Sequence, residues 1–310
     1  MANLNLHSCL LDALNDAPTV IATESSACIE RGCSTPEPCH VVAIVRSSVD
    51  AVELVYPPVI AVARTFFLAR GIRFTIEGSE QIPQTGGAVL ASNHVSYLDF
   101  VWVGLAARPS KRLVRFMAKD AVFTHKIAGP LMRGMKHIPV DRNAGAASFR
   151  AAVDDLRAGE VVGVFPEGTM SRSFRVKEIK SGSARMARST GTPLIPVATW
   201  GGQRLAYYDK RASFKHYGIP ILVAVGEPLD IGPRDNPEVA TVELKRRMEA
   251  LVERLQESYP DRPAPGEDPW WLPAAMGGTA PTPDEAAVLD EERAAGRDED
   301  YRKRARESGN

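Results

Sequence analysis

Polar side chains that could carry out acid–base chemistry stand at an abrupt change of pattern in "VLASNHVSYLDFVWVG", residues 89–104. A short apolar segment ends there, a helix-like one begins, and His94 and Asp99 lie five residues apart. On a continuous helix, five residues turn the chain by about 500°, so the two side chains would lie on different faces. They can meet only if a helix begins between them, with Ser96 as N-cap and Asp99 in the first turn. In that arrangement the Asp99 carboxylate accepts the Nδ1–H of His94 and leaves Nε2 as a base. On these residues alone, the alternative remains that Asp99 only caps the helix and His94 makes a local hydrogen bond.

Two further polar clusters follow apolar, strand-like segments. In "VVGVFPEGTMSRS", residues 161–173, the polar turn Glu167–Thr169 comes after a strand and is followed by Arg172. Its glycine would let backbone N–H groups approach an anion, and an arginine is a fork-shaped donor. In "MKHIPVDRN", residues 135–143, Asp141 and Arg142 occupy the same kind of position. Three strand ends that offer a base, a glycine turn and guanidinium groups predict a pocket for an anionic substrate.

Alternating strand-like and helix-like segments from Ile72 onward must position these side chains. The strand candidates are residues 72–78, 88–92, 112–119, 136–141, 161–168, 193–200 and 219–228. A final helix is expected from Pro237, capped by Asn236, to a stop at Pro260. The alternation predicts an α/β domain with a central, largely parallel or mixed sheet flanked by helices.

The motifs "NHVSYLD", "GMKHIPVDR", "FPEGTMSRS" and "PLIPVA" occur in the order and approximate spacing of the four sequence blocks of the glycerolipid acyltransferases. From about Tyr56 to Ser258 the chain resembles the 1-acyl-glycerol-3-phosphate acyltransferase family. The resemblance implies that His94, oriented by Asp99, takes the proton of a glycerol hydroxyl. The oxygen then attacks the thioester of acyl-CoA or acyl-carrier protein directly, without an acyl-enzyme. The resemblance implies no metal and no prosthetic group.

The resemblance also implies a substrate-binding set. It comprises residues in or after the four blocks: Asn93, Lys119, Arg142, Glu167, Gly168, Thr169, Arg172, Lys177 and Lys180. The sequence departs from the family where the third block usually reads F-P-E-G-T-R, because Met170 stands in place of the arginine. Either Arg172, Arg175 or Lys177 compensates for it, or the acceptor is a different lipid, such as a glycosylated phosphoinositide.

The formal net charge is zero, but it is unevenly distributed. Residues 1–45 carry −4, residues 261–310 carry −5, and the part between them carries +9. A basic body suits a phosphate-bearing lysophospholipid and an anionic membrane surface, and nucleic acid is not an expected partner. Residues 46–74 are predicted to form a membrane-interface helical segment, although a helix packed on the core fits the pattern equally well. We expect a peripheral or monotopic protein on the cytoplasmic face of a membrane, since the sequence has no secretory signal and no run of 18 apolar residues.

The domain organisation follows from composition. Residues 1–45 read as a poorly ordered extension, and its four cysteines do not have the paired spacing of a structural zinc site. Residues 75–260 form the predicted acyltransferase domain. Residues 261–310 read as an acidic tail containing Pro and Gly, which Trp270 and Trp271 would anchor onto the body.

Three other function classes were weighed against acyl transfer. A hydrolase with Ser96 or Thr169 as nucleophile lacks the G-x-S-x-G elbow. A metal phosphoesterase lacks a close ligand pair. A non-enzymatic membrane-binding module remains an alternative, and it predicts that removing His94 changes nothing.

Overall fold

The computed structural model describes residues 54–141, 145–208 and 217–308, all within one compact unit of the chain, Ser48–Asn310. The predicted N-terminal extension with its cysteines, the start of the predicted interfacial segment and Arg142 lie outside the described residues.

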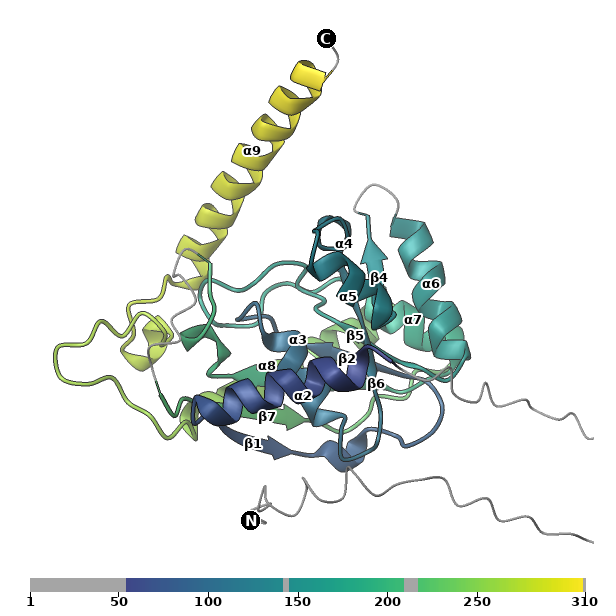
Figure 1. The fold of residues 1–310 in the computed structure, drawn as a ribbon, viewed down its shortest axis with the longest axis horizontal. Coiled ribbons are helices and arrows are strands. Elements are labelled where there is room, and N and C mark those ends of the chain that lie inside the picture. The colour runs from purple at the N-terminus through teal and green to yellow at the C-terminus, as the bar shows by residue number, and fades with distance from the viewer. Residues whose placement is uncertain (1–53, 142–144, 209–216, 309–310) are drawn as a thin grey trace, which may run out of the picture. The chain divides into compact units, whose positions relative to one another are not determined.

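A seven-stranded mixed sheet forms the centre of the domain (Figure 1). The strands lie in the order β1-β7-β6-β2-β5-β3-β4, and all neighbours run parallel except β6 and β7. This confirms the predicted α/β fold class. The strands are β1 (Arg73–Glu77), β2 (Ala88–Ser92), β3 (Val114–Lys119), β4 (Ile138–Val140), β5 (Val161–Val164), β6 (Leu194–Trp200) and β7 (Pro220–Val225).

The helices are α2 (Tyr56–Ala69), α3 (Asp99–Ala106), α4 (Asp120–Phe123), α5 (Ala128–Gly134), α6 (Gly145–Arg157), α7 (Gly182–Thr190), α8 (Pro237–Glu257) and α9 (Pro283–Ser308). Residues of α2 and α3 pack on one face of the sheet, and residues of α6, α7 and α8 pack on the other. Short 3-10 turns lie at Ser79–Gln81, Gly202–Arg204 and Ala274–Met276. Helix α8 begins as predicted, since the Asn236 side chain accepts the N–H of Glu238 at 2.9 Å and Pro237 occupies the first turn.

Strand β2 shows why the core has two halves. Its five residues are all buried, and successive side chains point to opposite faces of the sheet. Val89 and Ala91 join a cluster with residues of α6, α7 and α8, whereas Ala88 and Leu90 join one with residues of α2 and α3. A strand buried on both faces carries no polar side chain until it ends, so its chemistry is confined to the turn that follows.

The direction of the strands decides where those turns lie. Strands β6, β2, β5, β3 and β4 are mutually parallel neighbours, so their carboxyl ends share one edge of the sheet. The turn with His94 follows β2 and the turn with Glu167 follows β5, its immediate neighbour. The carboxyl edge of a parallel sheet is where α/β proteins bind ligands.

Helix α2 lies within the segment expected at a membrane interface. Tyr56 and Phe67 are buried against the domain, but Val62 is 70% exposed, and Phe66 and Leu68 are also exposed. One side of α2 therefore packs on the core and the other presents apolar side chains to solvent, while its place at a membrane interface stays a prediction. Among the described residues, no helix is both long enough and apolar enough to cross a membrane.

Trp270 and Trp271 hold the C-terminal segment on the domain, as the sequence predicted. Trp271 is 1% exposed, its backbone carbonyl accepts from Gln203 Nε2 at 3.2 Å, and Arg204 lies 4.4 Å from its ring centroid. Trp270 stacks on Tyr207 with ring centroids 5.9 Å apart. The helix α9 that follows was not anticipated, because its sequence has almost no apolar periodicity.

Candidate active site

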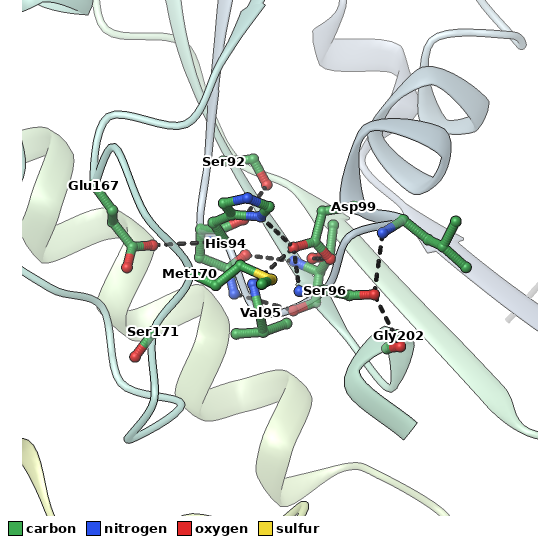
Figure 2. A network of polar contacts seen from close by, with 12 residues as sticks. Ser92, His94, Val95, Ser96, Asp99, Glu167, Met170, Ser171 and Gly202 are labelled. Carbon is green, nitrogen blue, oxygen red and sulfur yellow. Dashed lines mark hydrogen bonds and ion pairs between the residues drawn. The ribbon is translucent and has the colours of Figure 1, made fainter. Parts of the chain in front are cut away.

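A buried carboxylate organises the turn after β2 (Figure 2). Asp99 is fully buried, and its Oδ2 accepts the backbone N–H groups of Val95 and Ser96, each at 2.7 Å. Oδ2 also lies 2.9 Å from Nδ1 of His94, and Oδ1 accepts the hydroxyl of Thr199 on β6 at 2.9 Å. The expected contact between the histidine and the carboxylate is therefore present, and four donors fix the carboxylate.

The helix begins later than expected. We predicted a start near Tyr97 with Ser96 as N-cap, but α3 begins at Asp99. Ser96 Oγ instead accepts the N–H of Leu98 at 3.1 Å and lies 2.9 Å from the carbonyl oxygens of both Gly202 and Ala206. Because Ser96 is tied to the turn after β6, residues 96–98 form a separate turn before the helix.

Two side chains hold the imidazole of His94. Nδ1 faces Asp99, so Nδ1 carries the proton and Nε2 presents a lone pair. The ring stacks on Phe165 with centroids 4.3 Å apart and planes 22° from parallel. The side chain is 22% exposed, and Nε2 has no hydrogen-bond partner among the described residues. A histidine fixed in this way can accept a proton from a bound hydroxyl group.

The amide of Asn93 is engaged with the neighbouring strand, and its expected role in substrate binding stays a prediction. Asn93 is 2% exposed, and both polar atoms of its amide bond the backbone of Thr199. Nδ2 donates to the Thr199 carbonyl at 3.1 Å, and Oδ1 accepts the Thr199 N–H at 2.8 Å. Asn93 therefore clamps the end of β2 to β6, next to the Thr199 hydroxyl that supports Asp99.

Glu167 also turns inward. Its side chain is 7% exposed, Oε1 accepts the N–H of His94 at 2.9 Å, and Oε2 accepts the N–H of Lys177 at 3.3 Å. Burial raises the pKa of this carboxyl to about 8, against the opposing effect of the two backbone donors and the Lys177 charge. Glu167 thus ties the turn after β5 to the backbone of His94, and its expected place in the glycerophosphate site stays a prediction.

The rest of that turn has the character of an anion site. Gly168 is exposed with φ +72°, a left-handed conformation that favours glycine, and a Cβ at this position would lie 3.9 Å from Lys180 Nζ. Thr169 Oγ1 accepts from Lys177 Nζ at 2.8 Å. Lys119 is exposed at the end of β3, the strand beside β5. Neither Lys119 nor Lys180 has an ion-pair partner among the residues that the structure describes.

The neighbourhood of Met170 answers the question raised by the missing arginine. Met170 is 4% exposed and belongs to the core cluster, so this position offers no charge to a ligand. Arg172 and Lys177, the predicted replacements, both pair with Asp290 of α9. Arg172 also lies over the ring of Tyr208, 4.3 Å from its centroid. The third candidate, Arg175, pairs with Glu253 of α8 instead.

Several of these partners could not be found from sequence. Thr199 and Asp290 are separated from the residues they contact by 100 or more positions and stand in no recognised motif. Phe165 lies inside the F-P-E-G-T motif, but an aromatic residue that ends a buried strand reads as core.

A small apolar cavity of about 70 Å³ lies near this site, between α2, α3 and the start of β3. Its lining includes Val59, Phe67, Leu105 and Phe100, the residue after Asp99. Phe100 contacts Phe116 edge-on at 6.1 Å, and Phe116 in turn stacks at 6.1 Å on Phe165, which carries the imidazole of His94. A row of aromatic rings thus connects the cavity to the histidine.

The site thus combines a histidine held by a buried carboxylate, a cationic turn and a nearby apolar cavity at the carboxyl edge of an α/β sheet. Such a set of groups can activate a hydroxyl group. Comparison with known proteins indicates which reaction this is, because the model of the family described as Acyltransferase matches residues 73–200. The chain is similar to this family over the sheet and the site, and these likenesses support an acyltransferase enzyme.

The relatives of the chain include 1-acyl-sn-glycerol-3-phosphate acyltransferases from Bacillus subtilis, 28% identical over 59% of this chain and 84% of that protein, and from Borreliella burgdorferi, 27% identical over 52% and 63%. A chloroplastic protein of the same description from Arabidopsis thaliana is 27% identical and matches over 42% of its own length. The chain therefore spans most of the Bacillus relative but less than two thirds of the other two. The fold is similar to the crystal structure of a 1-acyl-sn-glycerophosphate acyltransferase from Thermotoga maritima, with a TM-score of 0.54, 22% identity, and coverage of 66% of this chain and 80% of that one.

Proposed function

We propose that the protein transfers an acyl group from acyl-CoA or acyl-carrier protein to the free hydroxyl of 1-acyl-glycerol 3-phosphate and so forms phosphatidic acid in phospholipid biosynthesis. The observation that carries this proposal is the His94–Asp99 pair within an acyltransferase domain. The names of the relatives supply the acceptor.

The chemistry requires a base and little else. His94 Nε2 takes the proton of the acceptor hydroxyl as its oxygen attacks the thioester carbonyl, and the thiolate of the donor leaves with the proton that the imidazolium returns. The Asp99 carboxylate stabilises the imidazolium that forms between these steps, in the manner of a serine-protease triad without the serine. A thioester is already activated, so positioning of the two substrates supplies much of the remaining rate enhancement.

The two substrates have separate places to bind. The apolar cavity between α2 and α3 suits part of an acyl chain, because its exposed lining is mostly apolar and it is linked to His94 through Phe100, Phe116 and Phe165. The cationic turn carries Arg172, Lys177 and Lys180, and Lys119 lies at the neighbouring strand end. These cations suit the phosphate of the acceptor.

Peripheral membrane association is part of the proposal. The exposed Val62, Phe66 and Leu68 of α2 would enter the interface of an anionic bilayer, and α2 also lines the apolar cavity. An acyl chain could then pass between the bilayer and the cavity without crossing water. We place the protein on the cytoplasmic face, where acyl thioesters are available.

A different lipid acceptor is the second candidate, and Met170 favours it. The position that usually carries an arginine is apolar and buried, so the acceptor phosphate has fewer fixed contacts here than the family pattern provides. A glycosylated phosphoinositide would keep the same chemistry and place its phosphate differently.

The test is a panel of acceptors presented to the full-length protein with palmitoyl-CoA in mixed micelles. Release of free CoA and the identity of the lipid product are followed for lysophosphatidic acid, glycerol 3-phosphate, a lysophosphoinositide and monoacylglycerol. The proposal predicts phosphatidic acid from lysophosphatidic acid as the preferred product. Preference for the lysophosphoinositide would favour the second candidate, and absence of acyl transfer to every acceptor would contradict both.

A further inference from the structure

A carboxylate from the C-terminal helix stands between two cations of the candidate active site. Asp290 Oδ1 accepts from Arg172 Nε at 3.2 Å, and Asp290 Oδ2 pairs with Lys177 Nζ. Each oxygen thus engages one cation, which is the arrangement that two oxygens of a phosphate would adopt on the same pair.

Both cations belong to the turn that contacts the histidine. The N–H of Ser171, the residue before Arg172, donates to the carbonyl of His94 at 2.7 Å. The N–H of Lys177 donates to Glu167, which accepts the N–H of His94 through its other oxygen, and Lys177 Nζ also donates to Thr169. An anion bound between Arg172 and Lys177 would therefore lie on the same turn as the predicted phosphate-binding residues.

The helix that brings Asp290 is held in place independently of this pair. Ala286, one turn before Asp290, is 7% exposed, and Arg293, three residues after it, lies 4.5 Å from the ring centroid of Tyr208. Upstream, Trp271 is buried in the domain. The docked helix lies beyond residues 73–200, where the family model matches, so this carboxylate is an addition to the acyltransferase domain.

We propose that Asp290 is a specificity-determining residue for the acceptor: its carboxylate takes the position between Arg172 and Lys177 that a phosphate of the acceptor would otherwise occupy. This inference rests on the proposed function, because that function names the reaction. The competition between Asp290 and a phosphate for the two cations does not depend on it. A phosphate-bearing acceptor must displace Asp290 to reach both cations, whereas a neutral acceptor gains nothing from them. Asp290 therefore reduces the preference of the enzyme for a phosphate-bearing acceptor over a neutral acceptor.

The size of the effect follows from exposure. The side chains of Arg172, Lys177 and Asp290 are 15%, 26% and 22% exposed, so the two ion pairs are partly screened by solvent. Partly exposed pairs are weak enough for a ligand to exchange, and losing both of them changes affinity by roughly tenfold. Asp290→Asn should thus lower KM for lysophosphatidic acid roughly tenfold with kcat changed less than about twofold.

The experiment compares the full-length wild type with three variants. Asp290→Asn removes the charge, Asp290→Glu keeps it, and Glu291→Gln removes one charge from an exposed neighbour that has no ion-pair partner among the described residues. Steady-state kinetics are measured with lysophosphatidic acid and with monoacylglycerol, and binding of glycerol 3-phosphate is measured by calorimetry without an acyl donor. Thermal unfolding verifies that all variants fold.

The expected result is a lower KM for lysophosphatidic acid and tighter glycerol 3-phosphate binding in Asp290→Asn alone, with monoacylglycerol kinetics unchanged. The inference would be overturned if Asp290→Asn did not lower KM for lysophosphatidic acid and also did not bind glycerol 3-phosphate more tightly. In the case of a raised KM, Asp290 would position Lys177 for the substrate instead. If lysophosphatidic acid is not acylated at all but Asp290→Asn still binds glycerol 3-phosphate more tightly, the proposed acceptor fails while the competition stands.

Discussion

Replacing Asp99 by Asn tests how the site holds its base, because the change removes a charge and almost no volume. In the wild type, Oδ2 accepts two backbone N–H groups and the imidazole Nδ1, while Oδ1 faces the hydroxyl of Thr199. An amide nitrogen at the Oδ2 position would point its hydrogens at the N–H groups of Val95 and Ser96. The side-chain oxygen of Asn must therefore take that position, and the amide nitrogen faces Thr199, whose hydroxyl can rotate to accept.

The magnitude of the loss follows from that orientation. The amide oxygen still accepts from Nδ1, so the tautomer of His94 is retained and only the charge is lost. A hydrogen bond to a charged group contributes about 1.5–3 kcal/mol, against about 1 kcal/mol for a neutral one. The difference, on the order of 0.5–2 kcal/mol, predicts a fall in kcat of roughly 2- to 30-fold.

Initial rates of CoA release at saturating acyl-CoA and lysophosphatidic acid measure this fall. Asp99→Leu is the comparison, since it leaves the N–H groups of Val95 and Ser96 buried without an acceptor and should lower both stability and activity much further. Wild-type activity in folded Asp99→Asn would refute the role of the carboxylate charge. A loss beyond about a thousandfold would refute the argument that the two backbone donors fix the orientation.

Two further predictions concern stability. Because burial raises the pKa of Glu167 to about 8 from an ordinary 4.5, the folded state keeps this proton after the unfolded state has lost it, so stability falls as pH rises between these values. The free energies of unfolding of Glu167→Gln and wild type are measured in urea at pH 5 and pH 9. The variant should gain on the order of 3 kcal/mol relative to wild type between these two pH values. A difference that does not change with pH would contradict the burial argument. Trp271→Ala should lower the free energy of unfolding by about 3–5 kcal/mol, since the ring is 1% exposed against Tyr259 and Arg204. A loss below about 1 kcal/mol would show that the C-terminal segment is not part of the folded core.

The sheet could be predicted from sequence because its strands are simple. Each of the seven expected segments contains an observed strand, since runs such as Ala88–Ser92 are buried on both faces and are bounded by glycine or polar turns. The sequence of α9 gave no such signal. Its contacts with the domain rest on single side chains such as Asp290 and Arg293 rather than on an apolar stripe.

The candidate site could be predicted only in part, for a related reason. The His94–Asp99 pair is local, so a break in pattern and a spacing of five residues were enough to predict the contact. The orientation of Asn93 and Glu167 depends on partners 106 and 73 positions away, and both turned toward backbone groups. At these two positions, a polar residue of a motif supports the turn, and the motif alone did not reveal this role.

The central claim is that His94 is the base of an acyl transfer, and His94→Ala tests it most directly. CoA release and phosphatidic acid formation are measured for wild type and variant at saturating lysophosphatidic acid and palmitoyl-CoA, with vesicle binding and thermal unfolding measured in parallel. We predict a fall in kcat of about 10²- to 10⁴-fold while vesicle binding and folding are retained. Activity of His94→Ala within a fewfold of wild type would contradict the account. If the wild type binds anionic vesicles but transfers no acyl group, the protein is a membrane-binding module instead.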